Sequence, residues 1–129
     1  MLVRKIFFIF SLSSFMVLSA AAQNKKFDAN RLYSIAYSVK HNGDWVRFKA
    51  EKKLPAISLL NDNKTIFGLG ASDNMSLVRT EEDDLGMTHY RYQQMYNSIP
   101  VECAEYIIHS RNGIAISGNG RLTRGVNIN

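Results

Sequence analysis

The sequence predicts an α+β fold, in the form of a small antiparallel β-meander with one short helix. Residues 87–96 alternate over ten positions, with Tyr, Thr and Gln side chains on one face, as a β-strand does. Turn signals that contain Asn-Gly recur between strand-like segments in the second half of the chain. Between residues 56 and 69, apolar side chains recur instead at helical spacing.

Residues 1–22 have the pattern of a secretory signal peptide. Arg4 and Lys5 precede an uncharged stretch, residues 6–22, which ends in three alanines. Its apolar part is roughly 15 residues long, whereas a transmembrane helix needs roughly 20. We therefore expect cleavage after Ala22, export to the periplasm or the exterior, and no membrane association once the signal is removed.

Residues 23–54 are expected to form an N-terminal lead that contains a hairpin. Residues 32–39 carry apolar and aromatic side chains at mixed spacing, which leaves a strand and a short helix as alternatives. Residues 41–44 include an Asn-Gly turn signal, and residues 45–49 alternate as a strand does. If both halves are strands, residues 33–49 form the hairpin.

Residues 55–125 are expected to form the main domain. Pro55 favours an extended residue before it, and the helix predicted over residues 56–69 stops at Gly68 and Gly70. Strands are predicted at 75–78, 87–96, 101–109 and 114–117, with turns at 81–86, 97–100, 111–113 and 119–120.

Charge and cysteine content exclude two classes of protein. The net charge is +5, and it falls to about +3 when Arg4 and Lys5 leave with the signal. The remaining basic residues are scattered rather than arranged in a stripe with aromatic residues, so nucleic-acid binding is not expected. Cys103 is the single cysteine, which excludes a disulfide framework. We interpret Cys103 as a small buried hydrophobic residue.

No set of residues in the sequence has the pattern of a catalytic or metal site. His41, His89 and His109 lie outside any His-Glu-x-x-His motif, although His89 and His109 can face each other across paired strands. The acidic run at 81–84 lacks the ligand spacing of a calcium loop, and the glycines at 68 and 70 lack the Lys of a phosphate loop. We therefore expect no catalytic residue, no metal ligand and no cofactor.

The second half of the chain resembles the propeptides of thermolysin- and fungalysin-type zinc metallopeptidases. The resemblance rests on Leu85-Gly86-Met87-Thr88-His89-Tyr90-Arg91-Tyr92-Gln93-Gln94, Tyr96, Ile99-Pro100-Val101-Glu102, Ala104-Glu105-Tyr106, Asn112-Gly113 and Asn119-Gly120, with Ile66-Phe67-Gly68-Leu69 before them. It covers roughly residues 55–125, and the motifs occur in the order that the family has. Cys103 stands where the family usually has a small residue such as Gly.

The resemblance implies a zymogen role: such propeptides are exported with the peptidase, assist its folding and inhibit it until they are cut away. It also implies that residues 55–125 are the front half of a propeptide fold, truncated at its C-terminus and without the catalytic domain. The chain is then either a precursor fragment, with the metallopeptidase as partner in cis or in trans, or a free-standing extracellular binding or inhibitor module. In either case the chain itself is not expected to be an enzyme.

The candidate partner-contact or sheet-ordering residues all lie on the strand at 87–96. They are Tyr90, Arg91, Tyr92, Gln93, Gln94 and Tyr96. Tyrosine and glutamine side chains combine large area with polar ends, a composition typical of protein interfaces. The sequence leaves open whether the face with Tyr90, Tyr92 and Gln94 is that interface or the core beneath the helix.

Overall fold

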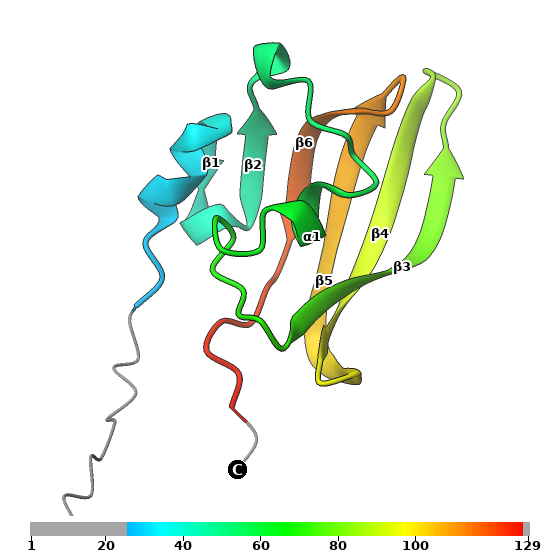
Figure 1. Ribbon diagram of the computed structural model, residues 1–129. Coiled ribbons are helices and arrows are strands. Elements are labelled where there is room, and N and C mark those ends of the chain that lie inside the picture. Colours follow the sequence, from blue (N-terminus) through cyan, green and yellow to red (C-terminus); the bar gives the residue numbers. More distant parts are fainter. Residues whose placement is uncertain (1–25, 128–129) are drawn as a thin grey trace, which may run out of the picture.

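One antiparallel sheet organises the chain. The computed structural model describes residues 26–127, and its six strands are ordered β1-β2-β6-β5-β4-β3 (Figure 1). The strands are β1 (Ala36–Lys40), β2 (Trp45–Phe48), β3 (Asp73–Glu82), β4 (Met87–Tyr96), β5 (Ile99–Arg111) and β6 (Ile114–Gly120). The helical elements are short: η1 (Ala29–Ser34), η2 (His41–Gly43), η3 (Ala50–Lys52) and α1 (Leu59–Asp62). An antiparallel sheet with a few short helical pieces agrees with the predicted α+β class.

Tight turns connect β3, β4, β5 and β6 into the predicted meander. Asn97 and Ser98 between β4 and β5 both have positive φ angles, 45° and 63°. Asn112 and Gly113 between β5 and β6 have φ angles of 50° and 76°. Two central residues with positive φ twist a hairpin in the same sense as its strands, which is why Asn and Gly are favoured there. These local preferences favour the β4–β5 and β5–β6 hairpins that the sequence indicates.

The N-terminal hairpin is part of the same sheet. β1 and β2 pair antiparallel, and β2 also pairs with β6 through Val46 and Gly118. The segment that the sequence left open between strand and helix is both in succession: η1 comes first, with the Asp28 side chain accepting a hydrogen bond from Asn30 N at 3.0 Å, and β1 follows. The hairpin therefore extends the meander beyond β6.

The connection from β2 to β3 crosses one face of the sheet and carries α1 (Figure 1). The helix predicted over residues 56–69 is wrong in length, because α1 has only four residues. Asn61 bonds instead to the backbone of β3, donating to Met75 O and accepting from Met75 N, both at 2.9 Å. Asparagine side chains that bond to backbone groups compete with helix formation, so the chain leaves the helix after one turn.

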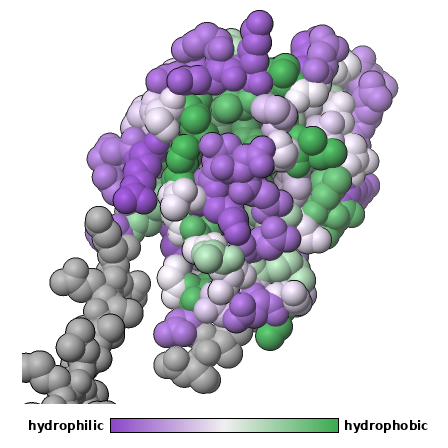
Figure 2. Space-filling view, viewed as in Figure 1, coloured by the Kyte–Doolittle hydropathy of each residue, from purple (hydrophilic) through white to green (hydrophobic). Residues whose placement is uncertain are grey.

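The core lies between this connection and the sheet. Its largest fully buried side chains include Phe67, Leu59 and Leu60 from the connection and Tyr106 and Ile108 from β5. The Phe67 and Tyr106 rings meet edge to face, with centroids 5.9 Å apart. Figure 2 shows the outside of this layer, where hydrophilic side chains lie over the middle and along the margin, with hydrophobic ones between them. The connection therefore acts as the second layer of the fold.

Two sequence predictions are corrected at the end of the sheet. Asn119 and Gly120 do not form a turn but belong to β6. A side chain at Gly120 would collide with the backbone oxygen of Glu105, so glycine serves here for close approach of two strands. β3 is also longer than predicted, and it continues through Glu81 and Glu82.

The signal peptide predicted over residues 1–22 lies outside the described residues. In the part of the chain that the structure describes, no helix is long and apolar enough to cross a membrane.

Candidate functional site: the two faces of strand β4

The candidate residues divide between two faces of β4, which lies between β3 and β5. The core face is the side toward the β2–β3 connection and carries Tyr90, Tyr92 and Gln94. The open face is the opposite side and carries His89, Arg91 and Gln93 together with their neighbours across the strands. The alternation predicted from the sequence therefore holds, but the two faces have different surroundings.

Tyr92 is a core residue with a polar end. Its side chain is 2% exposed, and its hydroxyl donates to Ile57 O at 2.6 Å. Burial, with a smaller contribution from the neighbouring Tyr90 phenol, raises the pKa of Tyr92 to about 12. Tyr92 thus joins the segment before α1 to β4.

Gln94 is fully buried and joins three distant segments. Its amide nitrogen donates to Asp73 Oδ1 at 2.9 Å and to Thr123 O at 2.8 Å, and its amide oxygen accepts from Thr123 N at 2.9 Å. Asp73 Oδ2 accepts from Gly70 N at 2.7 Å. All polar atoms of the Gln94 side chain are therefore used to hold β4, the start of β3 and the C-terminal segment together.

Gln93 supports an irregularity in β5. Its amide nitrogen donates to Val101 O, Gln94 O and Ala104 O, at 2.8, 3.0 and 3.2 Å. The β4–β5 register shifts at this point, which is a bulge. Gln93 therefore orders the sheet, whichever surface a partner contacts.

Cys103 lies in this bulge, and the prediction that it is buried is wrong. Its thiol is free and the residue is exposed, with a φ of 58°. That φ is in the left-handed region that favours glycine. Cys103 lies on the open face with Glu105, whereas Ala104 and Tyr106 between and beyond them are buried.

Arg91 lies on the open face and forms an ion pair across the strands. Its guanidinium lies 3.0 Å from Glu105 Oε2, and both side chains are more than a third exposed. Ile107 of β5 is the residue directly opposite Arg91. The Arg91 side chain bonds to Glu105 and not to the core layer, so it presents its charge on the open face.

Tyr90 and Tyr96 lie at the margins of the core. Tyr90 is partly buried and packs against the core cluster. Tyr96 lines a cavity of about 790 Å³ between the loop before β3 and the segments next to the two ends of the described chain. Arg124 also lines this cavity; its Nε donates to Phe67 O at 2.8 Å and its guanidinium lies 3.8 Å from the centre of the Phe27 ring. Burial lowers the pKa of Arg124.

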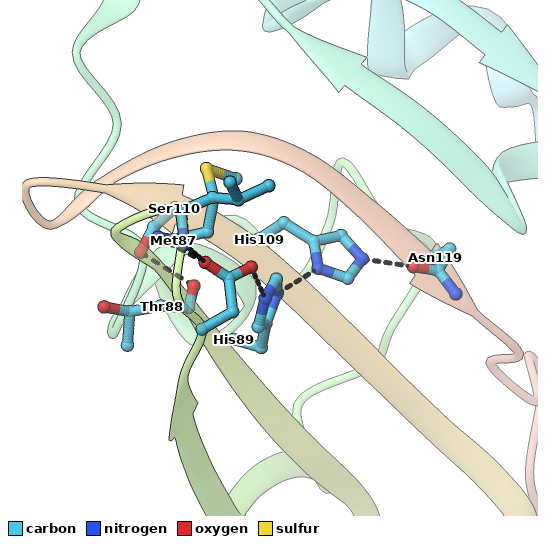
Figure 3. Close-up of polar contacts among 8 residues, drawn as sticks. Met87, Thr88, His89, His109, Ser110 and Asn119 are labelled. Carbon is cyan, nitrogen blue, oxygen red and sulfur yellow. Dashed lines mark hydrogen bonds and ion pairs between the residues drawn. The ribbon is translucent and has the colours of Figure 1, made fainter.

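A second polar cluster on the open face is a series of four side chains joined by hydrogen bonds (Figure 3). Asp83 Oδ2 lies 2.8 Å from His89 Nε2, the Nδ1 atoms of His89 and His109 lie 2.6 Å apart, and His109 Nε2 lies 2.5 Å from Asn119 Oδ1. The two histidines do face each other across paired strands. Hydrogen bonds from Met87 N and His89 lower the pKa of Asp83. Within residues 26–127, no three His, Cys, Asp or Glu side chains are grouped so as to hold a metal ion.

Sequence reasoning missed the residues that organise these contacts. Asp73, Asp83 and Asn119 each bond to a candidate residue or histidine from another element. Asp83 was visible as part of an acidic turn, and Asn119 as part of a turn signal. Neither pattern indicates a side chain aimed at a histidine, because that depends on the register between strands.

Residues 73–122 match the Fungalysin/Thermolysin Propeptide Motif. This segment is therefore similar to a propeptide motif of that family. It begins at the first residue of β3 and continues just past β6, so the motif coincides with the meander and includes both faces of β4. The β1–β2 hairpin and α1 precede it.

Several known proteins share sequence with part of this chain. Bacillolysin from Bacillus amyloliquefaciens is 34% identical over 77 residues, which is 53% of this chain and 15% of that protein. Thermolysin from Alicyclobacillus acidocaldarius is 37% identical over 65 residues, which is 49% of this chain and 12% of that protein. Bacillolysin from Bacillus subtilis is 34% identical over 62 residues, or 46% and 12%. The chain thus spans only a small part of the length of these relatives.

Proposed function

We propose that this chain is an exported propeptide-like protein that assists the folding of a zinc metallopeptidase catalytic domain and inhibits it. The observation that carries the proposal is the propeptide motif over residues 73–122, which coincides with β3 to β6. The matched part of the family is its propeptide motif and not a catalytic domain, which supports a non-catalytic role for the chain. The partner is a catalytic domain, in cis or in trans.

The geometry of β4 supports a division of labour among the candidate residues. Tyr92, Gln93 and Gln94 use their polar atoms within the chain, so they order the sheet. Arg91 presents its charge on the open face. A preformed sheet of this kind gives a larger domain a surface against which to condense, and Arg is a frequent interface anchor. In this proposal the open face contacts the peptidase, and the core face maintains the sheet.

The test is whether the purified chain inhibits and refolds a thermolysin- or bacillolysin-type peptidase. We expect inhibition that saturates with chain concentration and a higher yield of active enzyme when the denatured peptidase is refolded with the chain present. Tyr92→Ala serves as the control, because loss of the core should abolish both effects. Absence of both effects with the folded chain would contradict the proposal and favour a free-standing module with another extracellular partner.

A further inference from the structure

The hydrogen bonds of Asp83 determine which nitrogen of the His89 ring carries a proton. An ionised carboxylate only accepts hydrogen bonds. Asp83 Oδ2 lies 2.8 Å from His89 Nε2, and Asp83 Oδ1 accepts from the backbone nitrogens of Leu85 and Met87, each at 2.9 Å. His89 Nε2 therefore carries a proton, which leaves His89 Nδ1 to face His109.

The contact with Asn119 likewise determines which nitrogen of the His109 ring carries a proton. With the amide oxygen of Asn119 2.5 Å from His109 Nε2, that nitrogen must donate. The two Nδ1 atoms then face each other at 2.6 Å, and a hydrogen bond between them needs one proton. The two rings hold three protons in this arrangement and carry one positive charge. If the Asn119 amide turns over and donates, the rings hold two protons and no charge.

Four ring protons do not fit. With both rings fully protonated, two N–H groups would point at each other where the nitrogens are 2.6 Å apart. We propose that His89 and His109 form a proton-operated lock on the open face, which is closed with two or three ring protons and opens when the fourth proton binds. The lock joins an Asp83–His89 half to a His109–Asn119 half, so opening it loosens this end of the β4–β5 pair.

The charged groups around the lock balance one positive charge and not two. β3 contributes Glu81, opposite His89, but Glu81 is paired with Arg79 at 2.5 Å. On the open face, β4 contributes Arg91 next along the strand, and β5 contributes Arg111, with Glu105 farther along and bound to Arg91.

On the other side of the lock, β6 contributes the neutral Ser117 and Asn119. β2 contributes Arg47, which is opposite Ser117. Asp83 is therefore the carboxylate that bonds to the lock, and it matches a single ring charge. Like charges on facing rings repel, so the second charge opens the contact.

The inference goes beyond the proposed function, because it concerns the chain alone and requires no peptidase. The test is a titration of the histidine ring nitrogens of the purified chain by ¹⁵N NMR, from well above to well below the pH of about 6.5 at which free histidine titrates. We expect His89 and His109 to take up their protons in two separate steps. A scalar coupling between the two Nδ1 nuclei should be present before the second step and absent after it.

His41 is an internal reference, because it is exposed on the β1–β2 turn, away from the pair. The protection factors of the backbone amides of His109 and its neighbours facing β4, which correct for the intrinsic pH dependence of exchange, should fall on the order of tenfold after the second step, as expected for the loss of one hydrogen bond. Titration of both rings in one common step together with His41, or no coupling at any pH, would overturn the proposal.

His109→Gln provides a matched variant that keeps a polar side chain of similar size at the same position. Without the facing ring, His89 should take up its second proton in a single step, and the protection factors at this end of β4 and β5 should no longer change at that step. A persistent pH-dependent change of these protection factors in a folded His109→Gln chain would show that another group controls it. The wild-type titration tests the lock even if this variant does not fold.

Discussion

The core face and the open face of β4 use the same alternating strand in different ways. On the core face, Tyr92 and Gln94 are buried and bond to the backbone of segments distant in sequence. On the open face, His89 and Arg91 bond to side chains of the neighbouring strand and turn, and they stay partly exposed. The core face thus holds the molecule together, while the open face is free to change charge or contact a partner.

The stabilising role of the core face is tested most strongly by Tyr92→Ala. Removing a buried aromatic side chain should lower the free energy of unfolding by about 3–5 kcal/mol. A small domain has a total stability of about 5–15 kcal/mol, so much of the native population should be lost. Urea unfolding followed by circular dichroism measures the change.

Tyr92→Phe is the matched control for that experiment. It keeps the ring and removes only the hydroxyl that donates to Ile57 O, so it should cost about 1–3 kcal/mol through the acceptor left without its partner. A stability loss from Tyr92→Ala no larger than that from Tyr92→Phe would mean that the ring itself contributes little.

Gln94→Ala should have the next largest effect, about 2–3 kcal/mol, because it leaves Asp73 Oδ1 and both backbone groups of Thr123 without a buried partner. Besides lowering overall stability, this variant should loosen the C-terminal segment around Thr123. Hydrogen exchange should accelerate at the Thr123 amide before it does in the middle of the sheet. Equal acceleration at Thr123 and in β5 would show that Gln94 contributes only to overall stability.

The sequence allowed β4 to be predicted with its correct bounds, because alternation over ten residues and flanking turn residues are local signals. α1 and the Asn119-Gly120 turn were mispredicted because tertiary contacts prevail there. Asn61 bonds to β3 instead of supporting a helix, and Gly120 allows close approach to β5. Contacts between distant segments have no local signal.

The candidate site could be predicted only as a strand with two faces. Composition did not reveal which face is buried, because Tyr and Gln suit both an interface and a hydrogen-bonded core. The positive φ of Cys103 belongs to a bulge that Gln93 supports from the neighbouring strand. The sequence indicated that His89 and His109 can face each other across paired strands. The contacts of Asp83 and Asn119 with these rings could not be predicted, because they depend on the register between the strands.

Arg91→Ala should have the smallest effect on stability and the clearest effect on function. Exposed ion pairs such as Arg91–Glu105 contribute at most about 1 kcal/mol, so the variant should stay folded. If the open face contacts the peptidase, loss of an interface anchor costs upwards of about 2 kcal/mol of binding free energy, and inhibition should weaken by at least about thirtyfold. Measured inhibition constants, with circular dichroism on the same samples, give both quantities.

Arg79→Ala is the matched control for Arg91→Ala. Arg79 forms a similar exposed pair with Glu81, and it lies on the edge strand β3 directly opposite Arg91. A contact centred on β4 should be weakened more by Arg91→Ala than by Arg79→Ala, because anchors cluster near the centre of an interface. Equal and small effects of both variants, with the fold intact, would place the partner contact elsewhere. The core face of β4 would then be its essential side, and the open face would serve the histidine lock alone.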